Sequence, residues 1–110
     1  MISTVLYRKN DLYTGFRASG HSGYAEAGSD IVCAGVSVLG CTCVNALESL
    51  LGIRVLERAN EDGLLDFELP SEEGKAAGAQ LLMAALGQGL SDLQEAYPEY
   101  VKFEIKERRK

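Results

Sequence analysis

The sequence has few of the side chains that most metal sites and many active sites use, with one histidine and three cysteines among 110 residues. Any chemistry that pairs a cysteine with a histidine must therefore use His21. No Cys-x-x-Cys pair is present, and Cys41 and Cys43, two residues apart on an expected helix, cannot converge on one ion. We therefore expect no metal site and no other cofactor.

The odd number of cysteines and the lack of an export signal argue against a disulfide framework. Residues 1–9 are too short and become charged too early to form a signal peptide. We also expect no apolar run long enough to cross a bilayer. Together these observations predict a cytoplasmic protein with reduced thiols and no membrane segment.

Repeats, low-complexity segments and linkers are also missing, so we expect residues 1–110 to form one domain. A hydrophobic content of 46% argues against disorder. The formal net charge of −5 disfavours direct nucleic-acid binding, because proteins that bind nucleic acids usually carry a basic face. The basic residues near the end of the chain are interpreted as a solvated terminus. They are Lys106, Arg108, Arg109 and Lys110.

The first part of the chain predicts strands over 2–8, with Ile2, Thr4 and Leu6 on one face, and over 12–19, with Phe16 and Ala18 on one side. Asn10 and Asp11 between them are typical turn residues. Residues 20–29 contain three glycines and predict a flexible loop. The glycine spacing of this loop does not match that of phosphate-binding loops.

A long, almost uncharged stretch from Asp30 to Leu51 follows, and its length favours a helix over a strand. Asp30 is a suitable N-cap, and Gly52 stands where a helix often ends in a left-handed residue. Because this helix is apolar nearly all round, we expect it to be buried. It would lie between the sheet and either the second helix or a second subunit.

In the second half, Asp62-Gly63 predicts a hairpin between strands over 53–59 and 64–69. Ser71 and the acidic residues after it predict the start of a second helix. The expected apolar stripe of that helix consists of Leu82, Ala85, Leu86, Gly89 and Leu93.

A last strand is expected over 99–106, with Val101, Phe103 and Ile105 on its buried face. The resulting order is ββαββαβ. It indicates an α/β fold of the α+β sandwich type, in which two helices pack on a mainly antiparallel or mixed sheet.

The choice among the cysteines follows from the helix start. With Asp30 as N-cap, Cys33 occupies the first turn, where free backbone N–H groups and the helix dipole favour a thiolate. Cys41 and Cys43 lie at least two turns deeper and are expected to be small apolar filling. Cys33 is therefore the candidate nucleophile.

His21 lies in the glycine-rich loop before this helix and can fold back over its N-terminus as a general base. A solvated loop histidine is the alternative. Asp30 could orient His21 or only cap the helix. Ser37 could donate to the sulfur or to a carbonyl of its own helix. The backbone of Gly20–Gly23 could supply N–H groups for an oxyanion hole.

Two short blocks of the sequence stand at a specific spacing. They are Gly20-His21 and, after a short interval, Gly28-x-Asp30-Ile31-Val32-Cys33-Ala34 followed by Val36-Ser37. Together they resemble the signature of the bacterial ribosomal-processing cysteine proteases, and the whole chain is similar to that family in length and element order. Ser22 and Gly35 depart from the family pattern, which more often has alanine at both positions.

The resemblance implies a catalytic dyad of His21 and Cys33, with Gly20, Asp30 and Ser37 at the family's other matching positions. It also implies a homodimer of small α/β sandwiches. The implied task is to remove a short N-terminal extension from one large-subunit ribosomal protein, with the cut after an aromatic residue.

The leading hypothesis is therefore a cysteine endopeptidase that works through an acyl-enzyme. One alternative is a non-catalytic ribosome-assembly or peptide-binding module that holds the same tail without cutting it. A thiol redox sensor is a weaker alternative, because no resolving cysteine is close to Cys33 in the sequence.

Overall fold

The computed structural model describes residues 1–26 and 29–108. Gly28 of the second sequence block and the terminal Arg109 and Lys110 lie outside the described residues. The elements follow the order expected from the sequence. They are β1 (Ile2–Lys9), β2 (Leu12–Ser19), α1 (Ile31–Leu51), β3 (Leu56–Glu61), β4 (Leu64–Glu68), the short 3-10 helix η1 (Glu73–Lys75), α2 (Ala77–Ala96) and β5 (Val101–Glu107).

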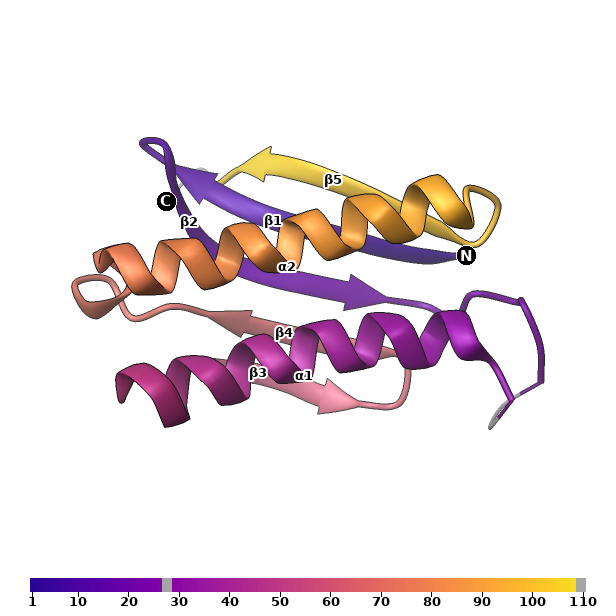
Figure 1. Ribbon diagram of the computed structural model, residues 1–110, viewed down its shortest axis with the longest axis horizontal. Coiled ribbons are helices and arrows are strands. Elements are labelled where there is room, and N and C mark those ends of the chain that lie inside the picture. The colour runs from indigo at the N-terminus through magenta and orange to yellow at the C-terminus, as the bar shows by residue number, and fades with distance from the viewer. Residues whose placement is uncertain (27–28, 109–110) are drawn as a thin grey trace.

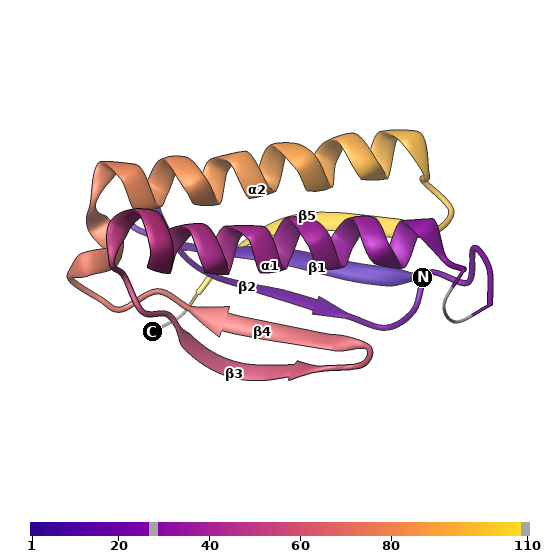
Figure 2. The same ribbon diagram turned by 60° about the horizontal axis from the view of Figure 1, so that its bottom comes forward.

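The five strands form one mixed sheet in the order β3-β4-β2-β1-β5. Neighbouring strands are antiparallel except β1 and β5, which run parallel, with Ile2 opposite Val101. Both helices lie on the same face of this sheet, α1 toward β3 and β4 and α2 toward β5 (Figures 1 and 2). The fold is thus the expected two-layer sandwich.

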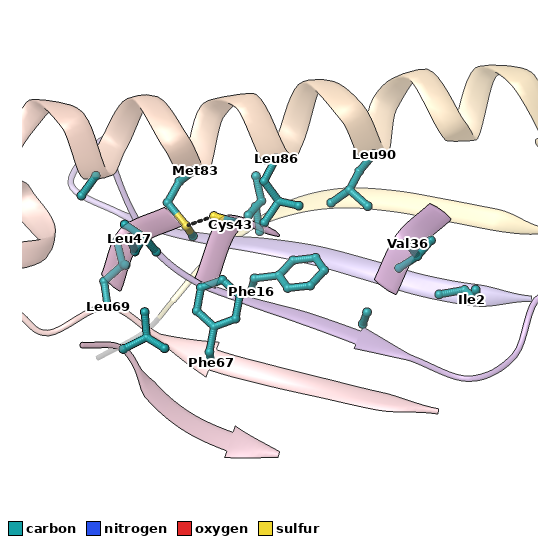
Figure 3. Packing of buried hydrophobic residues seen from close by; sticks show 14 of the residues in the cluster. Ile2, Phe16, Val36, Cys43, Leu47, Phe67, Leu69, Met83, Leu86 and Leu90 are labelled. Atoms are coloured by element: carbon teal, nitrogen blue, oxygen red, sulfur yellow. Dashed lines mark hydrogen bonds between the residues drawn. The ribbon is translucent and has the colours of Figure 1, made fainter. Parts of the chain in front are cut away.

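The core lies between the helices and the sheet (Figure 3). Phe16 of β2 and Phe67 of β4 are fully buried at its centre, with ring centroids 5.7 Å apart. Leu47 of α1 and Met83 of α2 close over them from the helix layer. Burying each such side chain contributes roughly 1.5–3 kcal/mol, so this alternation of apolar residues is what determines which face of the sheet is covered.

The opposite face of the sheet carries charged side chains, because neighbours in a strand point to opposite sides. Arg17 pairs with Asp66 at 3.4 Å, and Arg58 pairs with Glu68 at 3.0 Å. Arg108 also bonds Glu68 and lies over the Tyr7 ring, 4.1 Å from its centroid. Because these charged side chains can face water, this side of the sheet can be exposed to solvent.

Helix α1 begins and ends as expected. Asp30 is its N-cap, and Gly52 follows its last turn in the left-handed conformation with φ 65°. The inner face of this helix is buried as expected, but no other part of the described chain covers its outer face, where Ile31, Val38 and Leu50 are 56%, 63% and 73% exposed. Both helices share one layer, so α1 packs between the sheet and α2 while its outer face points away from both (Figures 1 and 2).

By length and composition alone, α1 could cross a membrane, contrary to the expectation that no apolar run is long enough. In the structure its inner face instead contributes Val32, Val36, Cys43 and Leu47 to the core. Passing that test is weak evidence for a membrane span, because core helices of globular proteins pass it too.

The second helix starts five residues later than a cap at Ser71 predicts. Residues 73–75 form η1 instead, and α2 begins at Ala77 without a side-chain cap. Tertiary contacts determine where this helix starts. Gly74 packs so closely on Leu69 that a Cβ at residue 74 would lie 2.7 Å from it. The Gln80 side chain donates hydrogen bonds to the carbonyls of Gly74 and Tyr13. The local capping signal at Ser71 is overridden.

The buried stripe of α2 also differs from the expected one, because Ala85 is exposed and Leu82 and Leu93 are half-buried. Its fully buried residues are Ala79, Met83, Leu86, Gly87 and Leu90. A Cβ on Gly35 of α1 would lie 3.5 Å from Leu93, so Leu93 packs against α1 rather than the sheet. The face that meets the sheet is therefore rotated from the one that sequence periodicity selected.

Two strand predictions need correction at their ends. Ile53 and Val55 are buried but precede β3, which starts at Leu56, because the Ile53 N–H bonds back to the Leu47 carbonyl after the helix cap. Ile105 is 44% exposed rather than buried, because β5 is an edge strand with a neighbour on one side only.

Candidate active site

His21 and Cys33 line one cavity of about 120 Å³. It lies at the end of the sheet where the loop after β2, the start of α1 and the β3–β4 turn meet (Figures 1 and 2). Its walls are Ile2, Ala18, Gly20, His21, Cys33, Val36, Ser37, Cys41, Asn60, Glu61, Asp62, Gly63, Leu64 and Leu65. The fold therefore brings together the two residues that the sequence paired.

Cys33 lies in the first turn of α1 and is half-buried. Its own backbone N–H donates to Asp30 Oδ1 at 2.9 Å, which holds this turn in shape. The Cys33 sulfur accepts a hydrogen bond from the Ser22 N–H at 3.4 Å. The structure thus places one backbone N–H donor at the sulfur, in the first turn of α1.

The His21 imidazole lies against the β3–β4 turn. A Cβ built on Gly63 would be 2.9 Å from His21 Nε2, so only glycine leaves room for the ring. The Gly20 N–H donates to the Gly63 carbonyl at 2.9 Å, which ties the loop to the turn. His21 itself is exposed, so it sits at the mouth of the cavity.

Sequence reasoning recognised Asp62-Gly63 only as a turn signal and missed its place beside His21. No local signal could have revealed it, because the contact depends on the pairing of β2 with β4, which puts Ser19 opposite Leu64. The same pairing brings Asn60, Glu61 and Asp62 into the cavity wall. Their place in the cavity wall could therefore not be predicted without the order of the strands in the sheet.

Asp30 makes the contacts of a helix cap. Its Oδ1 accepts from the backbone N–H groups of Val32 and Cys33 at 3.0 and 2.9 Å, and its Oδ2 accepts from the Ser22 hydroxyl. Of the two roles open from the sequence, these contacts match capping. They also link the start of α1 to the loop that carries His21.

Burial raises the pKa of the Asp30 carboxyl, but the hydrogen bonds from Ser22 and Cys33 outweigh it and hold the pKa at about 2, below its ordinary 3.8. Because the folded pKa lies below the unfolded one, the charged form adds stability above pH 3.8. This stability is lost as the pH falls through about 2.

We expect Asp30→Asn to be less stable than the wild type at pH 5, and the difference to shrink as the pH falls toward 2. Asparagine caps a helix about as well as aspartate, so the variant removes the charge and keeps the cap. Urea unfolding of both proteins at several pH values measures the difference. A difference in free energy of unfolding that stays constant over this range would contradict the assignment.

The supporting residues expected from the sequence lie nearby. Ser37, one turn after Cys33, lines the cavity. Gly20 also lines it and has φ 94°, and a Cβ there would be 2.8 Å from the Met1 carbonyl oxygen. Gly23 has φ 75° with open space around it. The N–H that reaches the Cys33 sulfur belongs to Ser22, between these two glycines.

The other two cysteines differ from each other. Cys43 is buried, as expected of apolar filling, with its sulfur 3.7 Å from Met83 Sδ (Figure 3), and burial raises the pKa of its thiol to about 11. Cys41 is half-buried and lines the cavity, which the sequence did not suggest. It lies two turns from Cys33, about 12 Å along the helix, beyond the reach of a disulfide.

Within residues 1–26 and 29–108, no group of three or more His, Cys, Asp or Glu side chains is arranged to hold a metal ion. The chemistry available at the cavity is that of a thiol and an imidazole in its lining, with one backbone N–H, that of Ser22, donating to the sulfur.

Comparison with known proteins gives a consistent family. The family model described as "Cysteine protease Prp" matches residues 1–102. A Bacillus subtilis (strain 168) protein named ribosomal processing cysteine protease Prp is 33% identical over 106 residues, which cover 93% of this chain and 95% of that protein.

Solved structures of similar proteins have the same fold, and one of them is a ribosomal processing protease Prp. A Streptococcus mutans protein of known crystal structure is 33% identical with a TM-score of 0.83, covering 98% of this chain and 96% of that one. An essential ribosomal processing protease Prp from S. aureus, crystallised with a covalently linked product peptide, is 26% identical with a TM-score of 0.88. This match covers 96% of this chain and 100% of the S. aureus chain.

Proposed function

This chain belongs to the cysteine protease family Prp, and on that basis we propose that Cys33 is its nucleophile and His21 its general base. The observation that carries the proposal is that both residues line one cavity, with Cys33 in the first turn of α1. The other two thiols are in weaker positions, because Cys43 is buried and Cys41 lies two turns deeper in the helix.

In the proposed mechanism His21 accepts the Cys33 thiol proton, and the sulfur attacks the scissile carbonyl carbon to form an S–C bond. Backbone N–H groups of the Gly20–Gly23 loop, among them the Ser22 N–H that donates to the sulfur, stabilise the oxyanion. As the C–N bond breaks, His21 returns the proton to the leaving amine. Water then hydrolyses the thioester and restores the thiol.

We further propose that the substrate is the N-terminal extension of a large-subunit ribosomal protein, cut after an aromatic residue. Relatives named as ribosomal processing proteases support this, among them an S. aureus protein crystallised with a substrate peptide. Apolar walls from Ile2, Val36 and Leu65 suit an aromatic side chain, and Glu61 and Asp62 suit a basic tail.

The same proposal includes a cytoplasmic homodimer that binds neither nucleic acid nor membrane. The net charge of −5 fits a partner with a basic peptide segment. The exposed apolar side chains on the outer face of α1 fit contact with a second copy of the chain.

Mass spectrometry of a synthetic peptide tests the substrate. The peptide spans the extension of the ribosomal protein from the same genome and continues into the mature protein. We expect a single cut after an aromatic residue, and no cut when that residue is changed to alanine. An intact peptide that nevertheless binds the protein would overturn the proposal in favour of a non-catalytic binding module.

A further inference from the structure

Ser22 has an unusual environment for a loop residue. It is 3% exposed, whereas His21, Gly23 and Tyr24 around it are exposed. A buried hydroxyl is costly unless it is hydrogen-bonded, so the contacts of Ser22 explain why it is there.

The Ser22 hydroxyl both donates and accepts a hydrogen bond. It donates to Asp30 Oδ2, and the same oxygen accepts from the Tyr24 N–H at 3.0 Å. The Ser22 backbone N–H donates to the Cys33 sulfur at 3.4 Å. One residue thus connects the loop, the N-cap of α1 and the thiol.

The loop has a second anchor next to this one. The Tyr24 ring packs edge-on against the rings of Tyr97 and Tyr100, at centroid distances of 5.7 and 5.2 Å. These tyrosines lie in the segment between α2 and β5. The Ser22 hydroxyl is therefore the link between the aromatic anchor and the start of α1.

We propose that Ser22 is a positioning residue for the Cys33–His21 pair, and that its hydroxyl fastens the loop to Asp30 so that the Ser22 N–H stays on the sulfur. This inference rests on the proposed function. Alanine at this position would remove both hydroxyl bonds and leave Asp30 Oδ2 and the Tyr24 N–H without that partner. Because His21 directly precedes Ser22, releasing the loop from Asp30 would also let the imidazole move.

The test measures peptide cleavage by the wild type, Ser22→Ala and Ser22→Thr. We expect Ser22→Ala to lower kcat about 10-fold with little change in KM, because misplacement of reacting groups slows the chemical step. Ser22→Thr keeps the hydroxyl and is expected to recover most of the rate. Ser29→Ala makes the same chemical change at an exposed loop position and is expected to have no effect.

A second readout needs no substrate. The rate at which iodoacetamide alkylates Cys33 is expected to fall in Ser22→Ala, while the rate at Cys41 stays the same, because only Cys33 receives the Ser22 N–H. Unchanged kcat and unchanged Cys33 alkylation in Ser22→Ala would overturn the proposal. So would a Ser22→Thr variant as slow as Ser22→Ala, and this comparison holds even if the alanine variant folds poorly.

The two readouts separate this proposal from the proposed function. A wild type that cuts no peptide would defeat the proposed function. The alkylation rate of Cys33 in Ser22→Ala relative to the wild type would still decide whether the Ser22 hydroxyl holds the loop at the Cys33 sulfur.

Discussion

Replacing Cys33 by alanine is expected to abolish peptide cleavage while the protein remains folded. Without the sulfur no acyl-enzyme can form, and removing a catalytic nucleophile commonly lowers the rate by at least about 10⁴-fold. Cys33 is half-buried, so the smaller side chain fits its place in the first turn of α1. Mass spectrometry of the peptide products and the thermal unfolding midpoint measure the two effects.

Cys41→Ala is the matched control for this experiment, because Cys41 is a half-buried thiol on the same helix and lines the same cavity. We expect that variant to keep cleaving. If Cys33→Ala retained the wild-type rate, or if Cys41→Ala lost it instead, the assignment of the nucleophile would be wrong.

Replacing His21 by alanine is expected to lower kcat by roughly 10²- to 10⁴-fold, the usual contribution of a general base. Gly63→Ala should also slow cleavage with His21 still present, because the added Cβ would stand 2.9 Å from Nε2 and displace the ring. The kcat and KM values of both variants measure the effect.

Gly52→Ala is the matched control for Gly63→Ala. Both glycines have positive φ, at 65° and 79°, so each substitution costs roughly 1–2 kcal/mol of backbone strain. At Gly52, however, the Cβ enters open space far from His21. A similar loss of activity in both variants would show that strain, and not the imidazole position, is responsible.

The local parts of this fold could be predicted because their signals are local. Asp30 and Gly52 bound α1 through hydrogen bonds within a few residues, and Asn10 and Asp11 form the β1–β2 turn with positive φ. The strands predicted over 2–8 and 12–19 likewise agree with β1 (Ile2–Lys9) and β2 (Leu12–Ser19). In each case the groups that cause the local structure lie within a few residues of it in the sequence.

The start of α2 could not be predicted in this way. Ser71 and the acidic residues after it match a helix start, but Gly74 packs on Leu69 and Gln80 bonds the Tyr13 backbone. These contacts join segments that the sequence separates. Local propensity is weak compared with such packing, so the helix begins where the tertiary contacts allow.

The candidate site also combines features that the local sequence predicts with features that depend on tertiary contacts. The pairing of Cys33 with His21 followed from one histidine and one helix start. The wall beside His21 depends on strand pairing, and the role of Ser22 depends on how the loop folds back onto Asp30. The two residues of the proposed dyad were therefore predictable, while the groups that hold them in place were not.

Peptide mapping of iodoacetamide-treated wild-type protein across a pH series is a decisive measurement for the proposed nucleophile. The structure predicts that Cys33 is labelled first and that Cys43 stays unlabelled at neutral pH, because burial raises the pKa of Cys43 to about 11. Labelling of Cys33 should also slow in His21→Ala. Equal labelling of Cys33 and Cys41, with no effect of His21→Ala, would contradict a thiol activated by that imidazole.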